Sequence, residues 1–150
     1  MESIESLIEA LTDKNTVRGC GAADALVAES EKSNAVYAYF PYFIKLMTDS
    51  NSYVRTRAMA LIAANVRWDE ERALDGAIEE FLTHILDVKP ITSRQCIKLL
   101  PGIARLRPDL LPEIRESLTK ANPYCYAESM RPLVEKDILN ALKELETIAG

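Results

Sequence analysis

Three arginines recur at a constant interval. Arg57, Arg94 and Arg131 stand 37 residues apart (94 − 57 and 131 − 94). A guanidinium group presents a rigid fork of N–H donors that fits carboxylates and phosphates. If the interval is the period of a structural repeat, these side chains line up about 10 Å apart, the usual distance between packed helices. We therefore predict that they bind an acidic peptide or another protein, with Tyr53 and Asn65 as neighbours in the same site.

The alternative is that these arginines are internal. Each guanidinium would then hydrogen-bond an aspartate or a main-chain carbonyl at a turn between repeats, and the resulting ladder would stabilise the fold. A ladder is the interpretation we give to Arg18 and Arg55, which also stand 37 residues apart (55 − 18). Both alternatives stay open for Arg57, Arg94 and Arg131.

The remaining reactive residue types do not form a recognisable catalytic or metal site. His84 is the only histidine, and without cysteine or carboxylate partners at ligand spacing we expect it to be a packed or surface residue. The three cysteines form no CxxC pair. Cys20 and Cys96 are expected in the core and Cys125 in an exposed loop. The sequence thus predicts no catalytic residue, no metal ligand and no cofactor, and we expect a protein that is not an enzyme.

The composition is that of one globular domain. A chain of 150 residues can bury a core without disulfides, and its 5 glycines and 7% aromatic residues favour helices over sheet. The net charge of −5 argues against a general nucleic-acid binder, because phosphate contacts need an excess of Lys and Arg. No apolar run is long enough to span a membrane, and the acidic N-terminus does not resemble a secretory signal. With an odd number of scattered cysteines, these features predict a cytoplasmic location.

Apolar residues with helical spacing occupy almost the whole chain. Pro41 is compatible with the third helix if it lies in the first turn. Thr92 to Gln95 resembles a capping box at the start of the sixth helix, and Pro101-Gly102 should kink or end that helix. The expected helices cover roughly residues 2–11, 14–31, 35–48, 52–66, 70–87, 92 onwards, 109 onwards and 127–148.

An apolar column follows the same period as the arginines. Leu7, Ile44, Phe81 and Leu118 are each 37 residues apart (44 − 7, 81 − 44 and 118 − 81). One helix pair cannot bury its apolar face alone, so a repeat of this length indicates stacked pairs. We predict an all-α fold, an α–α superhelix in a single domain over residues 1–150. Its four units cover roughly residues 1–31, 34–66, 69–107 and 109–148.

The turns between these helices resemble a known family. Asp13 to Arg18 and Asp49 to Arg55 are similar to the Asp…Val-Arg signature that opens the second helix of a HEAT repeat. The third unit, Asp87 to Thr92, keeps the aspartate and the apolar residue but lacks the arginine. The fourth unit departs further and resembles a capping unit. The layout is also similar to small bacterial HEAT-like proteins that sometimes carry the label SufBD.

The resemblance implies a scaffold that binds a protein or peptide on the groove formed by the second helices, where Arg57, Arg94 and Arg131 would lie. An alternative is an accessory protein of DNA-alkylation repair or iron–sulfur assembly. HEAT-like DNA glycosylases use Trp and Asp on a basic concave face, but here Asp69 is better explained as a helix cap and Trp68 as an apolar plug. A further alternative is a homodimer through the last helix, which carries more apolar residues than one face needs.

Overall fold

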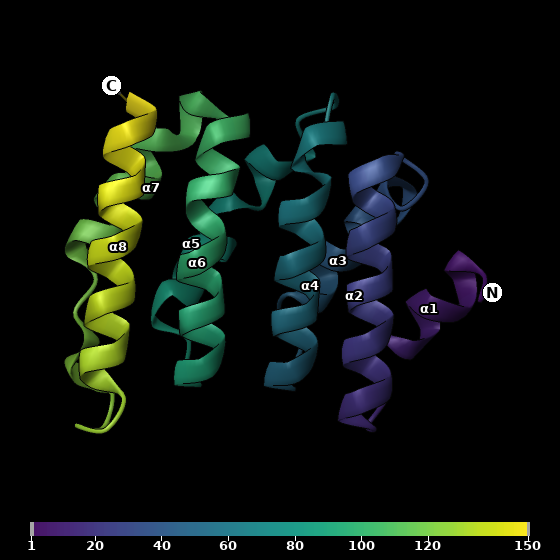
Figure 1. Ribbon diagram of the computed structural model, residues 1–150, viewed down its shortest axis with the longest axis horizontal. Coiled ribbons are helices and arrows are strands. Elements are labelled where there is room, and N and C mark those ends of the chain that lie inside the picture. Colours follow the sequence, from purple (N-terminus) through teal and green to yellow (C-terminus); the bar gives the residue numbers. More distant parts are fainter. Residues whose placement is uncertain (1, 150) are drawn as a thin grey trace. The chain divides into compact units, whose positions relative to one another are not determined.

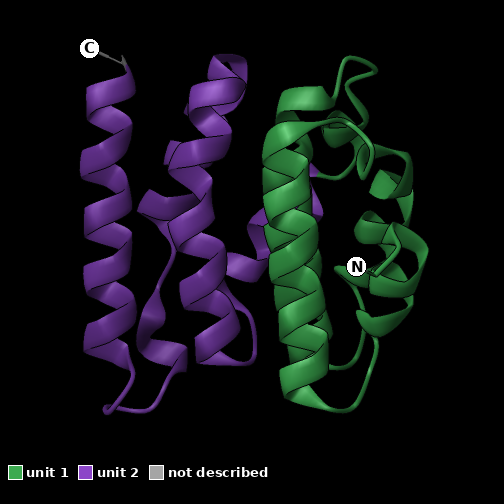
Figure 2. Cartoon of the chain, turned by 45° about the vertical axis from the view of Figure 1, so that its right-hand side comes forward, with its two compact units in different colours: residues 1–77 green, residues 78–150 purple. Residues whose placement is uncertain are grey.

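The fold is entirely helical. The structure of the chain is a computed structural model that describes residues 2–149, and within that range eight α-helices and six 3-10 helices follow one another without a strand (Figure 1). The predicted all-α class is confirmed. The chain divides into two compact units, Met1–Ala77 and Ile78–Gly150 (Figure 2). Sequence analysis predicted four helix pairs in one domain, and the third predicted pair, 69–107, crosses the boundary between these two units.

In unit 1, the second helices of the two pairs lie side by side. α1 packs against α2 and α3 packs against α4, while α2 and α4 contact each other along their length (Figure 1). The core between them is built from large side chains, including Phe40 and Phe43, that are fully buried. The elements of this unit are α1 (Ile4–Ala10), α2 (Thr16–Lys32), η1 (Tyr37–Tyr39), α3 (Phe40–Leu46), α4 (Ser52–Asn65), η2 (Val66–Trp68) and η3 (Ala73–Gly76).

Unit 2 has the same plan. α5 continues into η4, which packs against α6, α7 packs against α8, and the second helices α6 and α8 lie side by side (Figure 1). Phe81, Ile97 and Ile114 are among its fully buried side chains. The elements of this unit are α5 (Ile78–Thr83), η4 (His84–Leu86), α6 (Pro90–Leu106), η5 (Pro108–Leu110), α7 (Leu111–Lys120), η6 (Pro123–Cys125) and α8 (Arg131–Ala149).

The three aspartates of the HEAT-like signature make the same turn. In each case the main-chain N–H two residues further on donates to the carboxylate, at 2.8 Å for Asp13 and 2.9 Å for both Asp49 and Asp87. The side chains of Asn15 and Asn51 then accept N–H groups from the first turns of α2 and α4. α6 begins with a proline instead, whose missing N–H needs no acceptor. These aspartates therefore set where each second helix begins.

The predicted fifth helix, 70–87, is wrong as one continuous element. Arg72 adopts a left-handed conformation (φ 58°), which a helix cannot contain. The carboxylate of Asp69 accepts the N–H groups of Ala73 and Leu74, both at 2.9 Å, and so starts the separate 3-10 helix η3. Asp69 therefore binds the start of this short helix without being its N-cap residue, which is Arg72, so the predicted N-cap role is wrong.

The predicted boundaries of α6 and α8 are also wrong. α6 begins at Pro90, so Ser93 lies inside the helix, buried, where its hydroxyl donates to the Ile85 carbonyl at 2.6 Å. Pro101 does not end the helix, which runs to Leu106 with the proline ring buried. Its cost is one lost hydrogen bond within an otherwise packed helix.

α8 starts at Arg131, four residues later than predicted (131 − 127).

The α7 prediction needs a smaller correction. α7 begins at Leu111 with Pro112 in its first turn, as the sequence indicates. Asp109, where the predicted helix begins, does not cap α7, whose N-cap residue is Leu110. Its carboxylate instead accepts two hydrogen bonds from the Arg107 guanidinium, at 3.0 and 2.8 Å.

A close contact between Arg57 and Gly19 joins the two helix pairs of unit 1. Arg57 on α4 is buried, and its Nη1 donates to the Leu11 carbonyl at 2.8 Å, at the end of α1. The guanidinium crosses α2 at Gly19, where a Cβ would lie only 2.2 Å from the Arg57 Cζ. A side chain at this point of α2 would therefore displace the guanidinium. Gly21, two residues further on, faces open space.

The two glycines provide a matched test of this contact. Gly19→Ala should destabilise the protein by about 1–3 kcal/mol, because the added methyl group displaces a buried guanidinium. Gly21→Ala should stabilise it by about 0.5–1 kcal/mol, since alanine is the better helix former. Urea unfolding followed by circular dichroism measures both changes.

The same measurement in an Arg57→Ala background serves as the control. Without the guanidinium, Gly19→Ala should no longer destabilise, so the two substitutions should be strongly non-additive. Equal effects of the two glycine substitutions in the original chain would show that Arg57 does not occupy this position.

Candidate functional site

The three arginines of the predicted site do not occupy equivalent positions. Because α4, α6 and α8 begin at Ser52, Pro90 and Arg131, Arg57 is the sixth residue of its helix, Arg94 the fifth and Arg131 the first. Each step along a helix turns the side chain by about 100°. The second helices start 36, 38 and 41 residues apart (52 − 16, 90 − 52 and 131 − 90). Residues that are 37 apart in the sequence therefore lie on different faces of their helices.

Each of these arginines has a partner within its own unit. Arg94 Nε donates to Asp137 on α8 at 2.6 Å, a hydrogen bond that raises the pKa of the arginine. Arg131 Nη2 donates to the Tyr126 carbonyl at 3.2 Å, and its guanidinium lies 4.4 Å from the centre of the Tyr124 ring. With Arg57 bonded to Leu11, all three groups support the fold. Recognition of an acidic partner by them stays a prediction.

The two predicted neighbours are placed differently. Asn65 is fully buried and donates to the Ser30 hydroxyl at 3.0 Å and to the Leu61 carbonyl at 2.9 Å. Trp68 Nε1 donates to the Ser30 carbonyl at 2.7 Å, which adds to the contacts between the ends of α2 and α4. Tyr53 is exposed (58%) in the first turn of α4. Of the five predicted residues, Tyr53 is the one that the structure leaves well exposed.

The two signature arginines, Arg18 and Arg55, also differ from each other. Arg55 Nη1 donates to the carbonyls of Asp49 and Ser50, at 3.0 and 3.1 Å, and so secures the turn before its own helix. Arg18 pairs with Glu2 at 2.5 Å, and this hydrogen bond lowers the pKa of Glu2 to about 2. Of these two arginines, Arg55 is the one that hydrogen-bonds main-chain carbonyls of a turn, as the ladder interpretation requires.

A small polar groove lies between the second helices of unit 2, where the sequence places the binding surface. Its volume is about 230 Å³, and Pro101 and Ala141 are among the residues that line it. Two ion pairs join α6 to α8 beside it: Arg94 with Asp137 at 2.6 Å and Arg105 with Glu144 at 3.1 Å. Asp137 and Glu144 are thus engaged in ion pairs, while Lys98 and Asn140 also line this groove.

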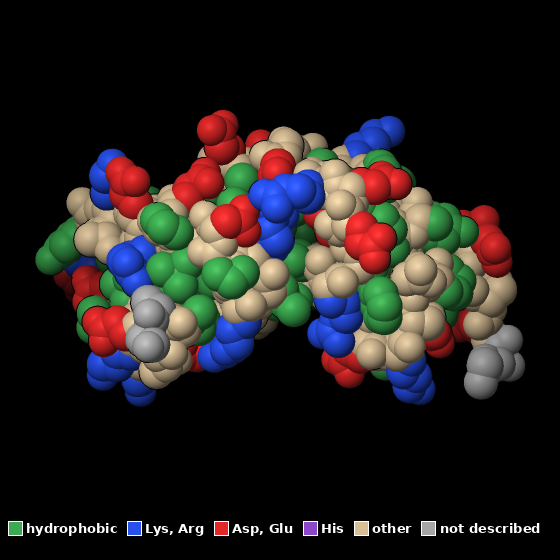
Figure 3. Space-filling model, turned by 90° about the horizontal axis from the view of Figure 1, so that it is seen from above, with side chains coloured by type: hydrophobic (Ala, Val, Ile, Leu, Met, Phe, Trp, Pro, Cys, Tyr) green, Lys and Arg blue, Asp and Glu red, His purple; other side chains and the backbone are tan. Residues whose placement is uncertain are grey.

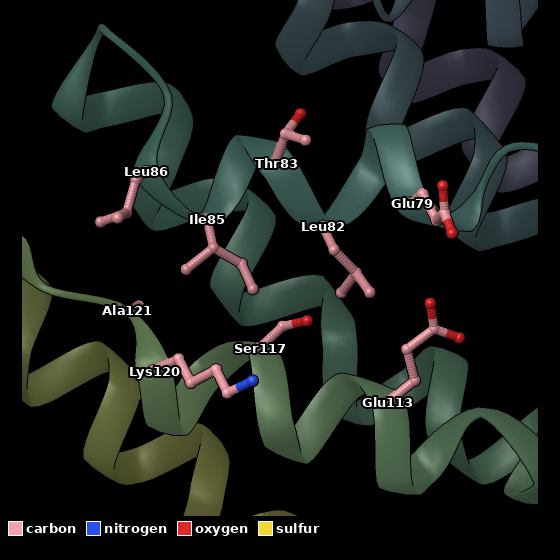
Figure 4. A pocket seen from close by; sticks show the side chains of 9 residues that line it. All are labelled: Glu79, Leu82, Thr83, Ile85, Leu86, Glu113, Ser117, Lys120 and Ala121. Carbon is pink, nitrogen blue, oxygen red and sulfur yellow. The ribbon is translucent and has the colours of Figure 1, made fainter.

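A larger groove, the α5–α7 groove, opens between the first helices of unit 2. It has a volume of about 410 Å³ (Figure 4). Leu82, Ile85 and Leu86 line it from α5 and η4, while Ser117 and Ala121 line it from α7 and the residue that follows. Leu86 is half-buried, so its side chain is accessible within the groove. The leucines and the isoleucine form an apolar floor on which side chains of a ligand can be buried.

The charges of the α5–α7 groove are separated along its length. Glu79 from α5 and Glu113 from α7 lie at one end, where their carboxylates point toward each other across the opening (Figure 4). Lys120 lies nearer the other end and pairs with Glu116 at 2.5 Å, a hydrogen bond that lowers the pKa of Glu116. Two carboxylates from different helices form a place for one basic group. Sequence analysis missed this site because α5 and α7 are distant in the chain.

His84 has carboxylate partners that the sequence analysis overlooked. Its Nδ1 lies 2.7 Å from the buried Asp87, and its Nε2 lies 3.1 Å from Glu80. The signal was present in the sequence, since Glu80 precedes His84 by four residues and Asp87 follows it by three. Asp87 also holds the turn before α6, and its carbonyl accepts the Tyr126 hydroxyl at 2.5 Å. Burial raises the pKa of Tyr126 to about 12. The cluster therefore holds the η4–α6 turn in place.

The described residues contain no group of His, Cys, Asp and Glu side chains that could hold a metal ion. Among the same residues, no helix is long and apolar enough to cross a membrane.

The chain matches no protein-family model, no curated protein and no solved structure.

The cysteines differ sharply in exposure. Cys96 is fully buried, and burial raises the pKa of its thiol. Cys125 is exposed, as predicted, whereas Cys20 is exposed although the sequence placed it in the core. The reason is its position on α2, more than about 100° round the helix from the buried Ala22 and Leu26.

Thiol labelling tests these positions. In the native protein, N-ethylmaleimide should modify Cys20 and Cys125 rapidly, while Cys96 should react only after unfolding, since the thiolate is the nucleophile and is disfavoured by burial. Peptide mass spectrometry identifies each modified residue. Labelling of Cys96 at the rate of Cys125 under native conditions would contradict the packing of α6.

Proposed function

We propose that the chain is a non-catalytic, HEAT-like scaffold that binds a short segment of a partner protein in the α5–α7 groove. The observation that carries this proposal is the apolar floor of Leu82, Ile85 and Leu86 between two helices, with a pair of carboxylates, Glu79 and Glu113, at one end. Grooves of this kind receive apolar side chains from a helix or an extended peptide.

A protein segment fits the groove better than a small metabolite or a nucleic acid. The groove is open to solvent and not an enclosed cavity, which suits a chain segment laid on the surface. Its charged end is acidic, and the chain carries a net charge of −5, so phosphate groups would be repelled. On the face shown in Figure 3, acidic and basic side chains alternate with apolar ones and no continuous basic surface is seen.

The packing within each unit supports the solenoid part of the proposal. In both units a pair of second helices lies side by side, and a first helix packs against each of them. Asp13, Asp49 and Asp87 form the same turn before three of these helices. Stacked helix pairs with a repeated turn are typical of HEAT-like solenoids, which bind proteins along their surfaces.

A binding site in the α5–α7 groove predicts a basic partner segment, whereas a site on the three arginines predicts an acidic one. Arginine recognition would select an acidic peptide, whereas Glu79 and Glu113 favour a Lys or Arg side chain between them. The charge-assisted hydrogen bonds would fix the direction of the peptide, and the apolar floor would supply most of the buried surface.

Selection from a random peptide display library tests the proposal. We expect enriched peptides to combine large apolar residues with at least one Lys or Arg. Leu86→Glu should weaken their binding by about tenfold or more, because a charge on the groove floor would be buried without a partner. Fluorescence anisotropy with a labelled synthetic peptide measures the affinity.

Leu106→Glu is the matched control, since Leu106 is exposed on α6 and does not line the groove. It should bind the peptide as the original chain does. Glu79→Lys with Glu113→Lys should remove the preference for basic peptides. A library that yields no enriched peptide, or peptides that bind the Leu86→Glu protein equally well, would contradict the proposed site, provided that both leucine variants unfold at the same temperature.

A further inference from the structure

A second apolar groove lies on a different surface of unit 2, between α7 and α8. Its volume is about 290 Å³, and Leu118, Pro123, Ile138 and Leu142 contribute to its lining. Leu139 stands at its edge with 59% of its side chain exposed. We call this surface the α7–α8 face. The exposed leucine extends the apolar lining of the groove onto the surface of α8.

The charges on α8 are arranged symmetrically about this leucine. Glu135 precedes Leu139 by four residues and Lys143 follows it by four, and both are exposed. At about 100° per residue, all three side chains lie within an arc of about 80° on one side of the helix. Within the part of the chain that the structure describes, neither Glu135 nor Lys143 makes an ion pair.

We propose that the α7–α8 face binds a second copy of the chain, with the two α8 helices antiparallel about a two-fold axis at Leu139. In such a pair, residues at equal distances on either side of Leu139 face each other. Glu135 of each copy then meets Lys143 of the other, so two ion pairs form at once. Lys136 of one copy meets Leu142 of the other, where its methylene stem covers the leucine.

Self-complementarity is the reason to prefer a second copy over another partner. A two-fold interface uses the same patch on both molecules, so each patch must carry both members of every contact. The α7–α8 face does so for charge, through Glu135 and Lys143, and for apolar contact, since Leu139 of each copy meets Leu139 of the other at the axis. A parallel arrangement would place Glu135 against Glu135, and like charges would oppose it. This inference does not rest on the proposed peptide site.

Sedimentation velocity at increasing concentrations tests the proposal with the full chain. We expect a dimer of twice the 16.8 kDa monomer mass. Glu135→Lys or Lys143→Glu alone should weaken dimerisation by about tenfold, since each turns two attractive contacts into repulsive ones. The double variant, and an equimolar mixture of the two single variants, should recover dimers, because both restore opposite charges across the axis.

Leu139→Glu should abolish the dimer, whereas Leu106→Glu, which alters an exposed leucine on α6, should leave it unchanged. Thermal unfolding by circular dichroism identifies any variant that fails to fold, and the mixing experiment does not depend on Leu139. A monomer at every concentration would overturn the proposal. So would a dimer that survives Glu135→Lys, Lys143→Glu and Leu139→Glu, since it would use another surface.

Discussion

A buried arginine that crosses a glycine determines how the helix pairs of unit 1 stack. The Arg57 guanidinium reaches from α4 across Gly19 of α2 to the Leu11 carbonyl at the end of α1. A carbonyl at a helix end has no partner within its own helix, and a buried charge needs hydrogen bonds. One contact meets both requirements and links three helices. The Arg57 guanidinium is thus used inside the fold, where it is buried.

Unit 2 links its helices through polar contacts as well, with different residues. The Asp87 carboxylate accepts a hydrogen bond from the Lys89 N–H and lies within hydrogen-bonding distance of His84. The main-chain carbonyl of Asp87 accepts a hydrogen bond from the Tyr126 hydroxyl. Arg94 and Asp137 connect α6 to α8. With these polar groups engaged in the fold, we consider apolar surfaces bordered by charge as the candidate binding surfaces. The two largest of the grooves described above, beside α5 and beside α8, are of this kind.

Periodicity predicted the helices because burial of one face is a local property of sequence. The predicted third helix required Pro41 to lie in a first turn, which it does because α3 begins at Phe40, and the resemblance to the HEAT signature pointed to the turns at Asp13 and Asp49. Periodicity could not place the arginines, because an insertion of one residue between helices rotates the next side chain by about 100° without changing the apolar pattern. The break at Arg72 depends on a single left-handed residue, and the α5–α7 groove depends on side chains from helices that the sequence does not connect.

The central claim is that recognition occurs on the first helices of unit 2 while the arginines serve the fold. Methyl NMR of the leucine and isoleucine side chains, with and without a saturating peptide that the protein binds, tests it most directly. The account predicts that the largest shifts occur at Leu82, Ile85 and Leu86, with little change at Leu61 and Ile62 of α4, which are buried in unit 1. Shifts that gather instead on the residues of the second helices would contradict it and restore the arginine surface as the binding site.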